Sequence, residues 1–246
     1  MYDLHCHLLP GIDDGARSLD ESVALAKMAL DDGVQGMVVT PHVHPGRWDN
    51  TREAIAATVA LVKTALDEAQ VPLALAWAGE VRLSDDILSM VAQHQIPFYG
   101  EVDGYQLMLL EFPHGHMVPG SDKLVDWLLA RGIRPMIAHP ERNKAVMREP
   151  DLIVPFVDKG CWLQVTANSV TGDFGAPAEQ TARWLLERNL VRVVASDAHN
   201  QRYRTPALSK AFDAVAERYG ATQAEDLFVT QPKAIFSAAL NRAEAY

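Results

Sequence analysis

Residues 34–42, VQGMVVTPH, form an apolar, β-rich run that ends in a histidine, and they follow an amphipathic stretch at Leu19–Asp32. The sequence SLDE at residues 18–21 predicts a capping box at the start of that stretch, and Gly33 is suited to end a helix there. The same alternation continues along the chain. Because the runs are continuously apolar, they are typical of parallel strands buried on both faces. The predicted strands are Met1–Cys6, Val34–Thr40, Leu73–Ala78, Tyr105–Leu110, Arg134–Ala138, Cys161–Val165 and Val191–Ala195.

Seven strands that alternate with helices predict an α/β protein with right-handed crossovers and a mostly parallel sheet. A closed or nearly closed (β/α)7–8 barrel and an open, doubly wound sheet both fit, although a length of 246 residues favours the barrel. No glycine-rich phosphate-binding motif follows a predicted strand, which weakens a dinucleotide-binding interpretation. We expect one domain over residues 1–246, with two or three extra C-terminal helices at Pro206–Tyr246 packed outside the barrel. The other predicted helices are Leu19–Asp32, Arg52–Ala69, Asp122–Ala130, Pro150–Lys159 and Pro177–Arg188.

The composition argues against several classes of protein. The chain has 22 Lys and Arg against 32 Asp and Glu, a formal net charge of −10, which argues against a general nucleic-acid or anionic-membrane binder. No apolar run approaches the roughly 20 residues that cross a bilayer, and the N-terminus lacks a basic and apolar leader, so no membrane insertion is expected. Cys6 and Cys161 are too few for a disulfide framework. We therefore expect a cytoplasmic protein.

Side chains of metal-binding type follow six of the seven predicted strands. In the first, His5 and His7 lie at positions i and i+2 of an extended segment, so they point to the same side and are able to hold one ion together. Because the carboxyl ends of parallel strands meet at one rim, we expect all these side chains to converge. Asp13 and Asp14, in the loop after the first strand, reach the same rim. The candidate ligands are His5, His7, Asp14, His42, Glu80, Glu111, His139, Asp197 and His199.

Imidazoles and carboxylates without a thiolate cluster suit Zn, Mn or Fe in an open catalytic site and argue against a structural zinc site. Nine candidates exceed the needs of one four-coordinate ion, so two or three ions are expected, with a carboxylate as a bridge. Such ions offset the negative charge locally and attract a phosphate ester. Cys6 and Cys161 are expected to be buried and inert, and neither is followed by the arginine that a Cys-based tyrosine phosphatase loop requires.

With these residues in this order, the chain resembles the PHP (polymerase and histidinol phosphatase) metal-dependent phosphoesterases. The opening DLHCHLLPGIDDGA at residues 3–16 narrows the resemblance to the bacterial polysaccharide-biosynthesis tyrosine phosphatases of that superfamily, as do IAHPER at 137–142 and ASDAHN at 195–200. The likeness extends over essentially the whole chain. Several PHP enzymes that act on small molecules or DNA have histidine at the position of Asp14, so this residue favours the tyrosine-phosphatase branch.

The resemblance implies a distorted (β/α)7 TIM-like barrel with a centre of three divalent metal ions. It also implies that Arg142 and Arg204 bind the phosphate of the substrate. The implied ligand sets, in which Glu80 bridges two ions, are His5, His7, Glu80 and Asp197; Glu80, Glu111 and His139; and Asp14, His42 and His199.

The expected reaction is hydrolysis of a phosphotyrosine monoester by metal-activated water, without a phosphoenzyme. Arg142 and Arg204 are expected to hold the equatorial phosphoryl oxygens, and His199 or another histidine of the rim to protonate the leaving oxygen. The substrate that the resemblance implies is the phosphorylated tail of a bacterial tyrosine kinase that controls capsule or exopolysaccharide export. Candidates for stacking on the substrate ring are Trp48, Phe112 and Phe174. His44, His114 and His116 match no ligand position, and solvation is favoured for them over lining the substrate groove. His94 is expected to be structural.

Three alternatives remain at this point. The first is a PHP phosphatase for a small molecule such as histidinol phosphate, or a phosphodiesterase. The second is a non-catalytic, metal-bound scaffold that binds the kinase tail or helps to assemble an export complex, and the complete ligand set disfavours it. The third is a metal-dependent amidohydrolase, which also opens with His-x-His but usually needs a bridging carbamylated lysine, and no predicted strand ends in lysine. No oligomeric state is predicted.

Overall fold

All seven predicted strands are present, and they run parallel to one another. The structure, a computed structural model, describes residues 1–244. The strands are almost wholly buried, which agrees with their continuous apolar sequence. They are β1 (Tyr2–Cys6), β2 (Gly36–Val39), β4 (Ala74–Trp77), β7 (Tyr105–Glu111), β8 (Ile133–Ala138), β9 (Trp162–Thr166) and β10 (Val193–Ala195).

Two short strands that the sequence did not predict, β3 (His42–Val43) and β5 (Glu80–Arg82), continue β2 and β4 after short breaks. Pro41 lies in the first break and has no N–H to donate to a strand ladder. Gly79 lies in the second, where a Cβ atom would approach Pro97 Cγ to 2.4 Å. β3 pairs with β5 so that His42 is opposite Glu80, and the breaks therefore place two candidate ligands side by side at the rim. A further strand, β6 (Gly100–Val102), pairs antiparallel with β7.

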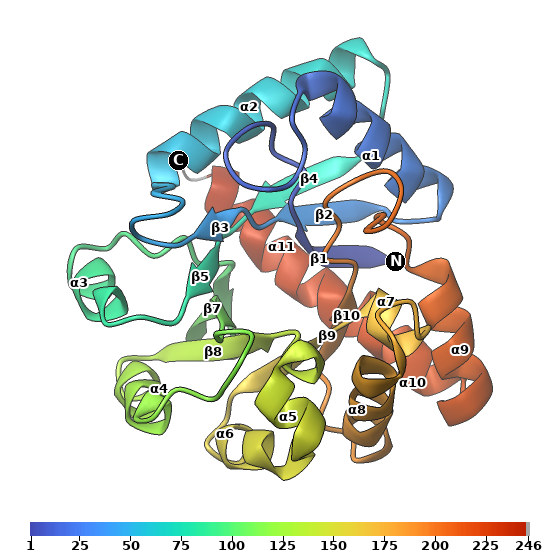
Figure 1. The fold of residues 1–246 in the computed structure, drawn as a ribbon. Helices are drawn as coiled ribbons and strands as arrows, with labels where there is room; N and C mark the ends of the chain where they lie inside the picture. Colours follow the sequence, from blue (N-terminus) through green and yellow to red (C-terminus); the bar gives the residue numbers. More distant parts are fainter. Residues whose placement is uncertain (245–246) are drawn as a thin grey trace.

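The hydrogen-bonded strands follow one another around a closed ring. One sheet has the order β1-β2-β4, and the other has the order β10-β9-β8-β7-β5-β3. Beyond β10, the Asp197 N–H donates to the His5 carbonyl and the His7 N–H donates to the Ala198 carbonyl, both at 2.8 Å. These hydrogen bonds join the segment that follows β10 to the end of β1. The fold is therefore a distorted (β/α)7 barrel, as predicted, and the open doubly wound sheet is excluded (Figure 1).

Helices surround the ring of strands (Figure 1). α1 (Leu19–Asp31) begins as predicted, because Ser18 Oγ accepts a hydrogen bond from the Glu21 N–H at 3.2 Å. The stretch Pro150–Lys159 divides into a 3-10 turn at Pro150–Ile153 and the short helix α6 (Val154–Asp158), because Pro155 has no N–H for a continuous helix. The remaining helices before the tail are α2 (Arg52–Glu68), α3 (Asp86–Ala92), α4 (Ser121–Leu129), α5 (Lys144–Arg148), α7 (Ala167–Val170) and α8 (Ala176–Glu187).

The tail forms α9 (Ser209–Tyr219), α10 (Ala221–Glu225), a π-helical turn at Asp226–Thr230 and α11 (Gln231–Glu244). Its last two positions, residues 245 and 246, lie outside the described residues. None of the described helices combines the length and apolar character needed to cross a membrane.

The prediction that the whole tail packs outside the barrel is wrong for α11, which crosses behind the strands in Figure 1. Its buried residues Ile235, Phe236 and Ala239 cluster with apolar side chains of the strands and with none from the outer helices. Phe236 contacts the first residues of two strands: its ring lies 5.3 Å from that of Tyr2, and a Cβ on Gly36 would lie 2.7 Å from it. α11 therefore closes the end of the barrel at which the strands begin.

Candidate metal centre

The structure brings the nine predicted ligands together at the rim where the strands end. Glu80, which begins β5, lies at the centre of the cluster. Its carboxylate oxygens lie 2.8 Å from His42 Nδ1 and 2.9 Å from His139 Nε2. They also lie 3.4 Å from Nε2 of both His5 and His7. One buried carboxylate thus faces four imidazoles that come from three different parts of the ring.

His5 and His7, at the end of β1, form one group of candidate ligands with Asp197. Nε2 of His5 and Nε2 of His7 lie 3.3 Å apart, and Asp197 Oδ1 lies 3.4 Å from each. On the far sides of the rings, His7 Nδ1 lies 2.7 Å from Asp13 Oδ2 and His5 Nδ1 lies 2.8 Å from Gln164 Oε1. Both oxygens are placed to accept a hydrogen bond from Nδ1, which would leave each Nε2 to an ion. Without an ion, Glu80 and Asp197 raise the pKa of His5, and Asp13 and Asp197 raise that of His7, against the effect of burial, so the group attracts positive charge and fits a metal ion.

A second group lies at the outer side of the rim. Asp14 Oδ1 lies 3.3 Å from His42 Nε2 and 3.2 Å from His199 Nε2. Glu111 has a carboxylate oxygen within 4.8 Å of ligand atoms of His42 and of the central carboxylate. Its Oε2 also lies 3.0 Å from Arg82 Nη1. Glu111 is therefore grouped with His42 and Glu80, whereas the implied ligand set joins it to Glu80 and His139. The clustered imidazoles and carboxylates fit metal binding.

The surrounding charges keep the central carboxylates ionised. Burial opposes ionisation of Glu80, but His5 and His42 outweigh it and hold the pKa of this carboxyl well below its usual range. Burial also opposes ionisation of Asp197, but His5 and Arg204 hold the pKa of that carboxyl well below its usual range. Both groups are therefore anionic at neutral pH and are suited to bind cations.

Two arginines line the same cavity, which has a volume of about 290 Å³. Arg142 follows His139 in the 3-10 turn Pro140–Arg142, and Arg204 lies in the loop after β10. Both guanidinium groups contact Asp197 Oδ2. Because guanidinium groups form charge-assisted, often bidentate hydrogen bonds with phosphate, the cavity combines cation ligands with anion-binding groups.

The three aromatic residues that are candidates for stacking on the substrate ring lie in different surroundings. Trp48 lines the cavity and stacks on His42, with ring centroids 4.5 Å apart and an interplanar angle of 11°. The Arg142 guanidinium lies 4.8 Å from the centroid of the Phe174 ring. Phe112 is buried in the outer core, so the prediction that it stacks on a substrate is wrong. It directly follows a rim residue of an extended strand and therefore points to the opposite side.

The remaining histidines and cysteines are not part of the ligand groups. His44 and His114 line the cavity, whereas His116 and His94 are exposed. Both cysteines are buried, as predicted, and burial raises the pKa of Cys161 to about 12. A thiol with such a pKa is a poor nucleophile at neutral pH.

Two residues that support the candidate ligands, Asp13 and Gln164, have no role that was predicted from the sequence. Asp13 and Gln164 bind the outer nitrogens of the two histidines at the end of β1. Asp13 also accepts hydrogen bonds from the backbone N–H groups of Gly15, at 2.9 Å, and of His42, at 3.1 Å. The adjacency of Asp13 to a predicted ligand pointed to the rim, but Gln164 lies within β9, and no pattern in the sequence links it to the first strand.

A parallel barrel with such a cluster at the ends of its strands defines a class, the metal-binding (β/α) barrel proteins. The chain belongs to the capsular polysaccharide synthesis CpsB/CapC family, whose model matches residues 1–237. It is 31% identical to the tyrosine-protein phosphatase YwqE of Bacillus subtilis, over 89% of this chain and 85% of that protein. It is 32% identical to the tyrosine-protein phosphatase CpsB of Streptococcus pneumoniae, over 96% of this chain and 98% of that protein.

The chain also resembles a solved structure from the study of two of these relatives. The chain superimposes with a TM-score of 0.90 and 29% identity on a structure from a study of YwqE and CpsB, described as metal-dependent tyrosine phosphatases. The match covers 97% of this chain and 95% of that chain. A lactonase from Listeria monocytogenes matches with a TM-score of 0.55 and 12% identity, which reflects the shared fold alone.

Proposed function

We propose that this protein is a metal-dependent phosphatase that hydrolyses phosphotyrosine monoesters. The observation that carries the proposal is the convergence of imidazoles, carboxylates and two arginines on one cavity at the carboxyl ends of the strands. The names of its relatives YwqE and CpsB support the assignment to tyrosine phosphatases. We infer that the chain acts as one catalytic domain, in the cytoplasm, on the phosphorylated tail of a bacterial tyrosine kinase that controls capsule or exopolysaccharide synthesis.

The proposal includes three divalent ions, which are Mn, Fe or Zn. The distances support one set around His5, His7 and Asp197, with Glu80 shared, and another around Asp14, His42 and His199. The third set, Glu80, Glu111 and His139, follows the family resemblance. The 2.9 Å approach of His139 to Glu80 supports it, and Glu111 is grouped with Glu80 and His42.

Bound ions would supply Lewis acidity, which lowers the pKa of a water molecule and polarises the phosphoryl oxygens. The protein itself orients the substrate: Arg142 and Arg204 donate charge-assisted hydrogen bonds to the equatorial oxygens as negative charge spreads over them. Burial and the neighbouring His7 lower the pKa of His199, which disfavours the protonated ring. We therefore assign His199 to ion binding in preference to protonation of the leaving phenolate.

A substrate panel on metal-loaded protein tests this function. We expect turnover of a phosphotyrosine peptide to exceed that of histidinol phosphate and of a phosphate diester, and a chelator to abolish it. Preference for histidinol phosphate would indicate the small-molecule phosphatase, and peptide binding without turnover would indicate the scaffold.

Two variants separate ion binding from phosphate binding. His139→Ala is expected to lose both metal and activity. Arg142→Ala is expected to keep its metal, measured by elemental analysis, while KM for the phosphopeptide rises about tenfold or more, because one charged hydrogen-bond donor is lost. Equal loss of metal in both variants would contradict the separate roles of these residues.

A further inference from the structure

A second groove adjoins the metal centre. It has a volume of about 540 Å³, and residues of the β1–α1 and β10–α9 loops line it. Asp14 and His199 line both this groove and the cavity of the metal centre, so the two hollows meet at these residues. Farther out, the groove is lined by the paired Arg17 and Glu21, and by Arg202 and Tyr203.

The β10–α9 wall is a loop that is fixed by its own hydrogen bonds. Asn200 Oδ1 accepts from the backbone N–H groups of Arg202 at 3.1 Å, Tyr203 at 2.8 Å and Arg204 at 3.3 Å. The Arg204 carbonyl accepts from the N–H groups of His199 and Asn200. The loop therefore turns Arg204 into the catalytic cavity and leaves the adjacent Tyr203 82% exposed. This aromatic ring is held in solvent at the edge of the site, where it is available to a ligand.

The opposite wall is also preformed. The Gly11 N–H donates to the Ala16 carbonyl at 2.8 Å, and the Ala16 N–H donates to the His7 carbonyl at 3.0 Å. At the end of this loop Arg17 forms an ion pair with Glu21 at 2.6 Å. Because both walls are ordered by internal bonds, a ligand in the groove does not have to order them, which favours its binding.

We propose that this groove binds the peptide residues that flank the phosphotyrosine, and that Tyr203 and Arg202 determine peptide specificity. The inference rests on the proposed function. A phosphate at the metal centre leaves its peptide chain at the mouth of the cavity, where Asp14 and His199 open into the groove. Tyr203 offers a broad face and a hydroxyl to the peptide, and the exposed Arg202 offers a cation to an acidic flanking side chain. The preferred substrate is thus a phosphotyrosine peptide with acidic flanks.

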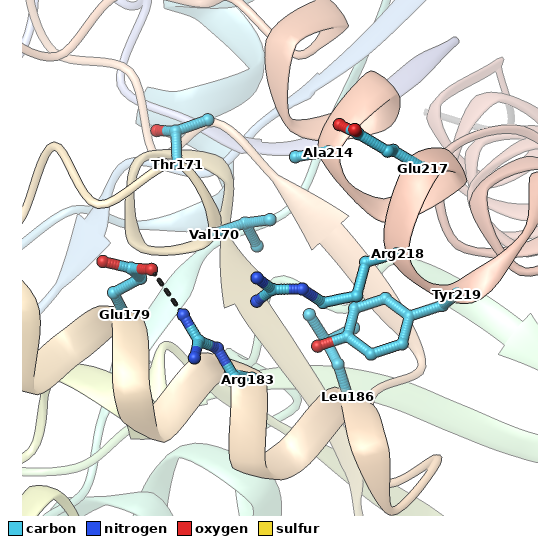
Figure 2. Close-up of a pocket in the computed structure, with 9 residues that line it drawn as sticks. All are labelled: Val170, Thr171, Glu179, Arg183, Leu186, Ala214, Glu217, Arg218 and Tyr219. Atoms are coloured by element: carbon cyan, nitrogen blue, oxygen red, sulfur yellow. Dashed lines mark hydrogen bonds and ion pairs between the residues drawn. The ribbon is translucent and has the colours of Figure 1, made fainter.

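A different hollow, of about 530 Å³, lies between α7, α8 and α9 (Figure 2). Figure 2 shows Arg183 and Arg218 pointing into it, and Arg183 forms an ion pair with Glu179 at 2.8 Å. Among the residues described as lining it, none also lines the cavity of the metal centre. This hollow therefore supplies a matched control, an exposed arginine in a hollow of similar size.

The test compares two substrates on metal-loaded enzyme: a phosphotyrosine peptide with acidic flanks, and free phosphotyrosine, which has no flanks. In Tyr203→Ala we expect the ratio of kcat/KM for the peptide to kcat/KM for the free amino acid to fall about tenfold. Tyr203→Phe is expected to recover most of the ratio if the ring face makes the contact. Calorimetric binding of the same peptide with a non-hydrolysable phosphonate is expected to weaken in parallel in Tyr203→Ala.

The charge of the groove is tested with Arg202→Glu and the control Arg218→Glu. Arg202→Glu is expected to lower kcat/KM for the acidic peptide about tenfold and to raise it for a peptide with lysine flanks, whereas Arg218→Glu changes neither by more than about twofold. An unchanged peptide ratio in both Tyr203→Ala and Arg202→Glu, or an equal effect of Arg218→Glu, would overturn the inference. Failure of the wild-type enzyme to hydrolyse free phosphotyrosine and peptide alike would instead overturn the proposed function.

Discussion

The two ends of the barrel are filled by opposite kinds of side chain. Where the strands begin, α11 inserts Ile235, Phe236 and Ala239 among apolar residues of the strands. Where the strands finish, buried imidazoles and carboxylates face one another. Apolar burial contributes about 25 cal/mol per Å² to stability, whereas gathered buried carboxylates oppose folding until cations or protons compensate them. The barrel therefore separates its stabilising core from its chemical site.

The largest expected effect is at the open end, in Glu80→Gln. Because Glu80 faces four imidazoles, its neutral replacement should prevent the shared binding of two ions and lower kcat/KM by roughly 10³-fold or more. Elemental analysis should show loss of metal while circular dichroism shows a retained fold. The matched control is Glu101→Gln, an exposed position on β6. Full activity in Glu80→Gln would contradict the proposal that catalysis depends on ions bound at this end of the barrel.

The next effect is at the closed end, in Phe236→Ala. Removal of this ring leaves a cavity against β1 and β2, so the free energy of unfolding should fall by about 3–5 kcal/mol. Urea denaturation measures the change. The kcat of the protein that remains folded should stay within about twofold of wild type, since the ring lies at the opposite end from the metal centre. A large fall in kcat with an unchanged stability would contradict the assignment of α11 to the stabilising core.

A smaller effect is expected for the residue that supports the ligands. Asp13→Asn should weaken metal affinity about 10–100-fold, because the amide is a weaker acceptor for the Nδ1 proton of His7. Saturating metal should restore most of kcat, and the exposed Asp20→Asn serves as the control. Affinity equal to wild type, measured by competition with a chromophoric chelator, would show that Asp13 has no positioning role.

The last effect, at most about tenfold for a change of one pH unit, is a dependence of metal binding on pH. Burial favours the neutral ring of His42, but the carboxylates of Glu80 and Asp14 outweigh it and raise its pKa to about 9. Because only the neutral imidazole binds metal, affinity at the group of Asp14, His42 and His199 should rise with pH, by up to about tenfold per unit, and level off above about pH 9. Calorimetric titration with Mn²⁺ at several pH values measures this, and an affinity that falls as pH rises would contradict it.

The raised pKa of His42 also predicts how the stability of the metal-free protein depends on pH. A raised pKa means that the folded chain binds the proton more tightly than the unfolded chain does. The stabilisation from His42 is therefore complete below its ordinary pKa of about 6.5, and it is lost as the pH rises through about 9.

The two ends also differ in how far the sequence predicts them. The candidate ligands were predictable because eight of the nine lie within four residues of the end of an apolar run, and the carboxyl ends of parallel strands meet at one rim. The burial of Phe112 was also predictable from strand alternation. As the neighbour of the rim residue Glu111, it has to face the other side of the strand. By contrast, Gln164 and Phe236 act on partners far away in sequence, at His5 and Gly36. Helical periodicity identifies an apolar face in α11 but does not identify the surface that it covers.

The anomalous diffraction of a crystal grown with Mn²⁺ would show whether metal ions bind where the strands end. We expect anomalous peaks within bonding distance, about 2.0–2.3 Å, of the imidazole and carboxylate atoms around Glu80, and a second set beside Asp14 and His199. A map with no peak at the ends of the strands, from protein that hydrolyses phosphotyrosine at full rate in the same solution, would contradict it.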